Sequence, residues 1–516
     1  MPIEEKSLET WLWDAACVIR GEKDAPKYKD YILPLVFVKR LCDVFDDEIS
    51  RIARQFGSRT KALKVIEKDH KLVRFYLPLK AKDPDKDDTW SVIRTLTEKV
   101  GEQLTSFMRD IAKFNPRIQG IIDRIDFNAT THGQRDISED SLIKLIERIS
   151  QKRLGLMDVE PDIIGRSYEY LIRKFAEGGG QSAGEFYTPR EVGLIMARVL
   201  DPEPGMEVDD ICCGSAGLLI KCQLALKEKM EARKEKGKYA PLQMYGQEFN
   251  PSTWAMANMN MVIHDMEGKI EIGDTMKNPK FKEGNRLKKF DLAITNPMWN
   301  QKTFVEKDYE NDELDRFKAG IPPTSSADWG WAQHILASLK DNGRAAVVLD
   351  TGAVSRGSGN ASNNKEKEIR KWFIEQDLVE GVLYLPENLF YNTTAPGIVL
   401  FLNRDKPRNR KDKVFLVNAS LNFEKGDPKN FIPESSQKKI ADAFLKWKEI
   451  EKFSRVVGKD EVVKNDYNIS PSRYIHTADA EEHRPIAEIV EELYELEDEA
   501  KAIDKKLKDI LKRIGY

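Results

Sequence analysis

The chain has 516 residues, a third of them charged, and its 83 basic and 86 acidic side chains leave a formal net charge of -3. This length is more than one hydrophobic core usually serves, so we expect two or three domains. The balanced charge excludes a protein that binds nucleic acid through an overall basic excess. Any DNA site must be a local patch or be shared with a partner.

Cysteine usage and the absence of apolar runs indicate a soluble protein of the cytoplasm. The five cysteines are too few for a disulfide framework and lack zinc-site spacing, which is typical of a reducing compartment. The first residues form no signal peptide, and no uninterrupted apolar stretch approaches the roughly 18 residues of a membrane helix. We therefore expect no membrane contact.

Residues 1–175 are predicted to form a helical N-terminal domain. Apolar side chains recur there at intervals of three and four, first at Leu8, Trp11, Leu12, Ala15, Ala16 and Ile19, and then at Leu33, Val36, Leu41 and Phe45. No convincing strand alternation interrupts this pattern. A glycine-rich stretch over 178–184 then marks a domain boundary.

Beyond that boundary, short apolar strands alternate with helices, which predicts an α/β domain over 176–430 with a doubly wound, mostly parallel sheet. The expected strands are Met206–Ile211, Met244–Glu248, Lys269–Ile272, Phe290–Thr295, Arg344–Leu349, Val379–Leu385 and Ile398–Leu402. Residues 431–478 form a mixed connecting region.

The tail, residues 479–516, is predicted to be a coiled-coil helix. Its apolar residues step by three and four over about four heptads, from Ile486 to Ile514, and Pro485 suits the first turn. Such a seam needs a partner helix. Both docking on the chain's own helical domain and pairing with another subunit remain open.

The tetrapeptide Asn296-Pro297-Met298-Trp299 follows a buried strand, where open α/β sheets place their chemistry. The asparagine side-chain oxygen and the carbonyl of Pro297 offer two acceptors to an exocyclic amine, and Trp299 offers a face to an aromatic base. This pattern predicts a site that holds the amino group of a flipped nucleobase.

Other strand ends carry groups that suit a nucleoside. Asp210 precedes the glycine-rich turn Gly214-Ser215-Ala216-Gly217, which lacks the G-x-G-x-x-G spacing of dinucleotide sites and by itself could be an ordinary βα turn. Glu248 follows the second strand, where it could accept both hydroxyls of a ribose, and Asp274 follows the third, where it could accept an adenine amine. Together they indicate a nucleoside pocket.

Upstream, Thr188 is the expected N-cap of a helix, with Pro189 as its first residue and Glu191 completing a capping box. The free N–H groups of this helix start and Arg190 would favour a carboxylate, such as the methionine end of S-adenosylmethionine.

These motifs follow the order found in adenine-N6 DNA methyltransferases, and the chain resembles the modification subunit of type I restriction-modification systems. The resemblance rests on Glu185-Phe186-Tyr187-Thr188-Pro189-Arg190, the glycine turn, Glu248, Asp274 and the Asn-Pro motif. It extends to the helical opening (Trp11–Ala16, Val36–Leu41) and to Arg344–Leu349, Leu385–Phe390 and Pro396–Phe401.

The resemblance implies a methyltransferase sheet and methyl transfer from S-adenosylmethionine to adenine N6 in double-stranded DNA, without a metal. The implied catalytic residues are Asn296, Pro297 and Trp299. The implied cofactor-binding residues are Glu185, Phe186, Tyr187, Thr188, Pro189, Arg190, Asp210, Gly214, Ser215, Ala216, Gly217, Glu248 and Asp274. The implied partners are DNA, a specificity subunit that binds the C-terminal helix, a second copy of the chain, and in some complexes a restriction subunit.

The chain departs from the family where Met298 replaces a second proline and where Ile211 and Cys212 replace Pro-Ala. Met298 leaves both amine acceptors in place. Two alternatives remain: a catalytically silent, cofactor-binding scaffold of a DNA-bound complex, and a nicotinamide-dependent oxidoreductase. The basic stretch Arg404–Lys413 is either a phosphate contact or a solvated hairpin tip.

Overall fold

The computed structural model describes residues 5–18, 25–159, 161–178, 188–235, 237–301, 309–310, 312–359, 364–391, 393–427, 429–477 and 486–513. Its contacts divide the chain into two compact units, Met1–Ile475 and His476–Tyr516. Within the described residues, no helix is long and apolar enough to cross a bilayer.

The first third of the chain is helical, as the sequence predicted. Its helices are α1 (Glu5–Cys17), α2 (Ala25–Phe56), α3 (Arg59–Ile66), α4 (Ser91–Arg94), α5 (Val100–Phe114), α6 (Glu139–Ile149) and α7 (Pro161–Gly178). The predicted apolar positions of the first two helices lie in one hydrophobic cluster, except Ile19, which lies outside the described residues. The two-residue strands β1 (Thr130–Thr131) and β2 (Gln134–Arg135) form a hairpin that the sequence did not predict.

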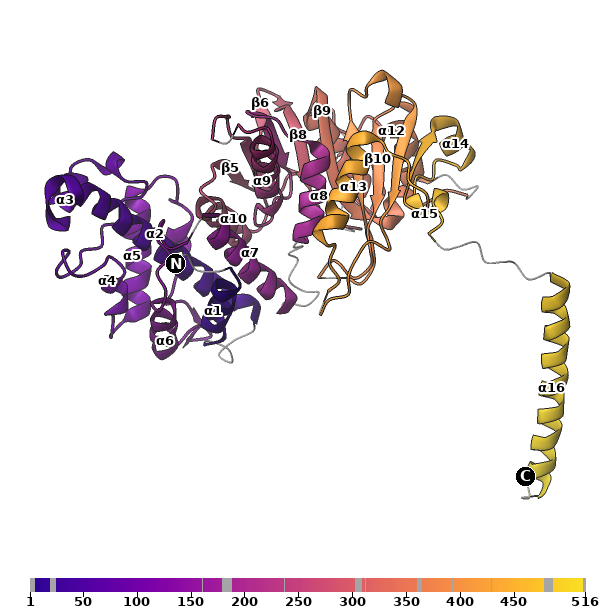
Figure 1. Ribbon diagram of the computed structural model, residues 1–516, viewed down its shortest axis with the longest axis horizontal. Coiled ribbons are helices and arrows are strands. Elements are labelled where there is room, and N and C mark those ends of the chain that lie inside the picture. The colour runs from indigo at the N-terminus through magenta and orange to yellow at the C-terminus, as the bar shows by residue number, and fades with distance from the viewer. Residues whose placement is uncertain are drawn as a thin grey trace. The chain divides into compact units, whose positions relative to one another are not determined.

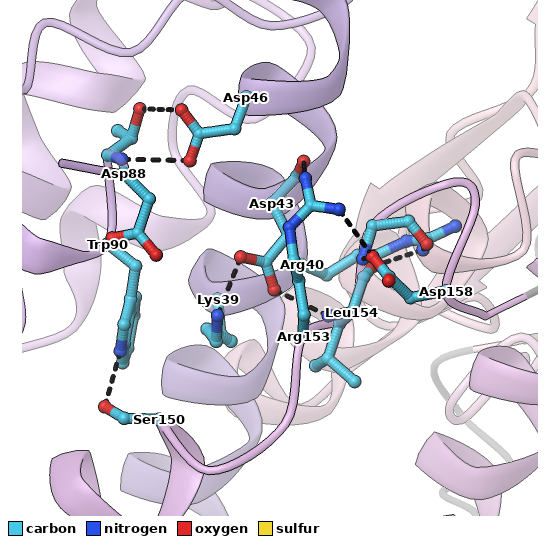
Figure 2. Close-up of polar contacts among 12 residues, drawn as sticks. Lys39, Arg40, Asp43, Asp46, Asp88, Trp90, Ser150, Arg153, Leu154 and Asp158 are labelled. Atoms are coloured by element: carbon cyan, nitrogen blue, oxygen red, sulfur yellow. Dashed lines mark hydrogen bonds and ion pairs between the residues drawn. The ribbon is translucent and has the colours of Figure 1, made fainter. Parts of the chain in front are cut away.

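Polar side chains of α2 fix the segment that leads into α7 (Figure 2). Asp43 accepts a hydrogen bond from the backbone N–H of Leu154 at 2.6 Å and pairs with Lys39 at 2.7 Å. Arg40 donates to the carbonyls of Leu154, Gly155 and Val159. Because these groups are buried and mutually satisfied, they hold the segment just before α7 at a defined place on the helical domain.

A sheet of nine strands forms from the described residues, in the order β13-β12-β10-β11-β9-β8-β3-β4-β5. The strands from β9 to β5 pair in parallel, and β11 and β13 run antiparallel to their neighbours. The bounds are β3 (Glu207–Asp210), β4 (Gln243–Glu248), β5 (Gly268–Ile272), β8 (Phe290–Thr295), β9 (Leu339–Asp350), β10 (Val379–Tyr384), β11 (Gly397–Asn403), β12 (Lys413–Asn418) and β13 (Ser454–Gly458).

Side chains alternate between the two faces of this sheet along each strand. Apolar side chains therefore emerge on both faces, and helices cover both. In β8, Leu292 and Ile294 pack under α8 (Arg190–Leu200), α9 (Gly217–Ala232) and α13 (Glu434–Lys446), which lie along one face (Figure 1). Ala293 faces the opposite cluster, with α11 (Asp328–Ser338) and α12 (Lys365–Glu375). This is the doubly wound, mostly parallel architecture predicted from the sequence.

Helix α10 (Pro251–Ile263) joins the helical part to the sheet, because its side chains enter two hydrophobic clusters. Met256, Met259 and Ile263 pack into the helical cluster, whereas Ala257 and Met261 pack beneath the sheet. The helix is apolar on opposite sides, which is typical of a helix buried between two layers.

All seven predicted strands are present in the nine-stranded sheet, and the sequence analysis missed the other two strands of that sheet. Strand β12 begins at the last residue of the basic stretch, and β13 lies in the region described as mixed, which also contributes α13, α14 (Lys459–Lys464) and α15 (Pro471–Tyr474). Cations of the basic stretch pair within the fold: Arg404 with Asp341, the buried Lys406 with Asp377, and Arg410 with Glu380.

The second unit contains the predicted C-terminal helix, α16 (Ile486–Arg513). Pro485 and Ile514 lie outside the described residues. Seam residues of this helix are exposed, among them Leu493 at 55%, Leu496 at 56%, Ile503 at 63% and Leu507 at 51%.

Candidate active site

Four strand ends meet at one edge of the sheet, because β8, β3, β4 and β5 are consecutive parallel neighbours. The carboxyl ends of parallel strands point to the same edge, where open α/β sheets bind ligands. Asp210 and Glu248 are the last residues of β3 and β4, and Asn296 and Asp274 lie one and two residues beyond the ends of β8 and β5. The predicted clustering of these groups at one edge agrees with this topology.

Side chains of neighbouring elements hold the backbone of the glycine turn between β3 and α9. Gly214 has a φ of +52° and Ala216 a φ of +61°, so the turn uses left-handed conformations. The Gly214 N–H donates to Glu248 Oε2 at 3.0 Å, and Asn260 Nδ2 donates to the carbonyl of Ser215 at 2.9 Å. Helix α9 then begins without a side-chain cap. Its N-terminus therefore faces this edge with a partial positive charge.

A pocket lies over this turn, and it brings together residues from several segments. Its lining includes eight of the predicted site residues, namely Thr188, Pro189, Arg190, Asp210, Gly214, Ser215, Gly217 and Asn296. The remaining lining residues are Glu169, Gly193, Cys212, Cys213, Leu218 and Lys221. Ala216, Glu248, Asp274, Pro297 and Trp299 do not line it, and Glu185, Phe186 and Tyr187 lie outside the described residues.

The carboxylates at the strand ends differ in their surroundings. Burial raises the pKa of Asp210 to about 7, and the nearby Glu248 carboxylate adds to this rise. Glu248 itself accepts from two backbone N–H groups, those of Gly214 and Asn250. Asp274 Oδ1 accepts from the backbone N–H groups of Met276 and Lys277 at 2.9 and 3.1 Å, so this oxygen stabilises the turn that follows Asp274.

The capping box predicted at Thr188 is wrong. Helix α8 begins at Arg190, Pro189 takes the N-cap position, and no side chain caps the helix. The Thr188 hydroxyl instead accepts a hydrogen bond from Asn296 Nδ2 at 3.0 Å. The prediction failed because the Thr188 hydroxyl bonds to Asn296, which lies 108 positions away in the chain. Short-range spacing does not reveal such a partner.

Hydrogen bonds and ring packing hold the Asn-Pro loop, residues 296–299. Asn296 is 6% exposed, and its Oδ1 accepts from the indole Nε1 of Trp299 at 3.0 Å. The Trp299 ring meets Phe390 edge to face, with 4.8 Å between centroids. Pro297 is buried, whereas Met298 is 39% exposed. The family departure at Met298 thus falls on a side chain that faces outward.

The far end of this loop is anchored by a buried carboxylate. The N–H of Asn300 donates to Asp328 Oδ1 at 3.0 Å, and Asp328 Oδ2 pairs with Arg356 at 2.6 Å. Arg356 also pairs with Asp350 and Glu366. Because Asp328 is fully buried and paired, its position is fixed, and it fixes where the loop leaves the site.

Sequence reasoning missed an ion pair in the pocket wall. Lys221 of α9 lies 2.6 Å from Glu169 of α7, and their side chains are 4% and 5% exposed. Burial by itself would raise the pKa of Glu169, but Lys221, His264 and Arg190 lower it below the ordinary value. The one available signal was a lone lysine in the apolar start of α9, Leu218 to Leu226.

Within the described residues, no three or more His, Cys, Asp or Glu side chains are grouped so that they could hold a metal ion. The cysteines at positions 17, 42, 212, 213 and 222 are free thiols. Cys213 and Cys222 are buried, and burial raises their pKa, so their thiols are protonated at neutral pH.

Comparison with known proteins identifies the family. Residues 159–483 match the model described as N-6 DNA Methylase, and residues 8–149 match the HsdM N-terminal domain. The chain belongs to the N-6 DNA methylase family and resembles the methylase subunits of type I restriction enzymes.

Individual relatives match most of the chain. The MjaVII methylase subunit of Methanocaldococcus jannaschii is 33% identical over 503 residues, which are 94% of this chain and 81% of that protein. The HindI methylase subunit of Haemophilus influenzae is 31% identical, over 79% of this chain and 90% of its own. A crystal structure of a type I methyltransferase subunit from Streptococcus thermophilus superposes with a TM-score of 0.73 at 27% identity, covering 92% of this chain and 100% of that one.

Proposed function

We propose that this N-6 DNA methylase transfers a methyl group from S-adenosylmethionine to the N6 amine of an adenine rotated out of double-stranded DNA. The observation that carries the proposal is the position of Asn296, which lines the same pocket as the glycine turn. A donor bound over that turn and an amine held at Asn296 would share one cavity, as direct transfer requires.

The donor set of the pocket fits the cofactor. Its methionine end carries a carboxylate and an ammonium group, and the pocket wall offers charges of both signs in Arg190, Lys221 and Glu169. Helices α8 and α9 both begin at the pocket without side-chain caps, and such helix N-termini favour an anion. Glu248, beside the turn, remains our proposed acceptor for the ribose hydroxyls, and Asp274 remains the proposed acceptor for the adenine amine.

The proposed reaction requires the protein to orient the adenine amine and to accept its hydrogen bonds. S-adenosylmethionine supplies an electrophilic methyl group when bound. Asn296 Oδ1 and the carbonyl of Pro297 would accept the two N6 hydrogens, which aims the nitrogen lone pair and stabilises the positive charge that grows on it. Trp299 would stack on the adenine, which stabilises a bound base by about 1 to 3 kcal/mol.

We propose that sequence recognition comes from a separate specificity subunit, which docks on α16. The exposed Leu493, Leu496, Ile503 and Leu507 supply an apolar seam of the kind that pairs with another helix. A second copy of the chain, DNA and in some assemblies a restriction subunit complete the proposed complex. The near-neutral charge of the chain supports shared DNA binding.

The test is transfer of tritium from labelled S-adenosylmethionine to unmodified DNA by the chain co-purified with its specificity subunit. We expect Asn296→Ala to lose at least about 100-fold in rate, as removal of a group that stabilises transition-state charge does. Asn285→Ala, at an exposed asparagine outside the pocket and outside the basic stretch, is the matched control and should retain activity. Undiminished incorporation by Asn296→Ala would reject the assignment.

The silent-scaffold alternative predicts a different result in the same preparation. It requires cofactor binding, measured by calorimetry, with no methyl transfer in the presence of the specificity subunit. Asn296 is buried and makes two hydrogen bonds, to Thr188 and Trp299. This arrangement favours the enzymatic function, because a silent scaffold has no need of an amine acceptor held in the cofactor pocket. The family matched by the chain gives no support to the oxidoreductase alternative.

A further inference from the structure

The Asn296 carboxamide is bonded at both of its ends. Its Nδ2 donates to Thr188 Oγ1 at 3.0 Å, and its Oδ1 accepts from Trp299 Nε1 at 3.0 Å. A carboxamide rotated by a half-turn would set its NH₂ group against the indole N–H, so the bond to Trp299 would be lost, whereas the Thr188 hydroxyl could turn and donate to the oxygen. The indole, which can only donate, therefore selects the orientation of the amide, and Thr188 accepts from its NH₂ end.

We propose that Thr188 and Trp299 are positioning residues that clamp the Asn296 carboxamide with its oxygen ready to accept the target amine. This inference rests on the proposed function. An amide oxygen has two lone pairs, and the indole occupies one of them. The second lone pair stays available for an N6 hydrogen, and its direction is set before the base arrives.

The indole is itself held in place by packing. Its ring lies edge to face with Phe390, and a Cβ atom at Gly397 would lie 2.8 Å from Trp299 Cη2 and 2.9 Å from Phe390. Only glycine leaves room for both rings at this point. The packing fixes the ring, and the fixed ring aims its N–H at Asn296, a role distinct from stacking on a base.

Thr188 links the clamp to the other side of the pocket. It directly precedes Pro189 and Arg190 at the start of α8, and all three residues line the pocket together with Asn296. The segment proposed to contact the methionine end of the cofactor therefore also sets the amide that receives the base. A valine at position 188 would keep the shape and replace only the hydroxyl, which accepts from Asn296 Nδ2, by a methyl group.

Thr188→Val and Thr188→Ser form the matched pair for the kinetic test, measured in the complex with the specificity subunit by single-turnover methyl transfer. We expect Thr188→Val to slow transfer about 3- to 10-fold, the effect of one neutral hydrogen bond. In Thr188→Val, the affinities for S-adenosylmethionine and DNA should stay within about 2-fold of the wild type, and the midpoint of thermal unfolding within about 2 °C. Thr188→Ser should recover the rate. Wild-type rates in Thr188→Val, a parallel loss of cofactor affinity, or failure of serine to rescue would each overturn the clamp.

A second readout does not depend on activity. In protein labelled with ¹⁵N at tryptophan indoles, the Trp299 resonance is assigned by its disappearance in Trp299→Phe. We expect this resonance to move in Thr188→Val and in Asn296→Ala, because both changes release or remove its acceptor. A resonance that stays in place in Asn296→Ala overturns the clamp. If Asn296→Ala still transfers methyl groups at the full rate while the resonance moves, the role proposed for Asn296 fails, and with it the purpose of the clamp, although the contact between Trp299 and Asn296 is established.

Discussion

Lys221→Met breaks the buried ion pair in the wall of the proposed cofactor pocket and leaves Glu169 without its ammonium partner. The two charged groups lie 2.6 Å apart with almost no exposure, so Glu169 would remain a buried carboxylate. Removing one partner of such a pair costs about 3 to 5 kcal/mol. We expect the free energy of unfolding, measured from urea titrations, to fall by that amount at pH 8.

The loss should depend on pH, and its direction follows from the pKa of Glu169. In the wild type that pKa is lowered, against the effect of burial, by Lys221 with His264 and Arg190. The carboxylate therefore adds stability above its unfolded pKa of about 4.3, and this is lost as pH falls through the folded value. In Lys221→Met, burial outweighs the remaining cations and raises the pKa, so stability instead falls as pH rises.

The difference between the two proteins should then be smaller at pH 5 than at pH 8, changing by at most about 1.4 kcal/mol per pH unit. The control is Glu169→Met/Lys221→Met, which replaces both charges by apolar chains of similar length. It should recover most of the lost stability, because an apolar pair often replaces a buried ion pair at little cost. A loss that is the same at both pH values, or is unrelieved in the double variant, would refute this reasoning.

Four further outcomes are expected. Gly165→Ala should lower the midpoint of thermal unfolding, by about 1 to 3 kcal/mol in stability, since its Cβ would lie 2.3 Å from the His264 ring; an unchanged midpoint contradicts this. Gly397→Ala should reduce methyl transfer more than cofactor affinity, because it displaces the indole beside it, and equal losses would argue otherwise. Asp210→Asn should stabilise the cofactor-free protein more at pH 8 than at pH 5 in urea titrations, because a carboxyl pKa raised to about 7 makes folding less favourable as pH rises. Leu493→Asp should abolish co-purification with the specificity subunit while leaving cofactor binding intact, and a retained complex would place the interface elsewhere.

The fold and the strand-end residues were predictable because both depend on short-range patterns. Apolar runs mark buried strands, and the parallel connection of those strands brings Asn296, Asp210, Glu248 and Asp274 to one edge without further information. Strand β13 escaped prediction because it is a short edge strand in which only Val456 and Val457 form an apolar pair. Strand β12 was hidden by the basic residues before it, whose charges suggested a hairpin tip.

What the sequence could not reveal are contacts between elements far apart in the chain. The Thr188–Asn296 bond spans 108 positions and the Glu169–Lys221 pair spans 52, and neither has a local pattern. The first contact joins the loop after β8 to the segment before α8, and the second joins α9 to α7, so in each case one partner lies upstream of β3, the first strand of the nine-stranded sheet. Part of the pocket wall is thus supplied from outside the sheet by α7 and the segment before α8. Because α2 fixes the segment just before α7, the helical domain helps to determine where Glu169 lies, so its contribution extends to the geometry of the pocket proposed for methyl transfer.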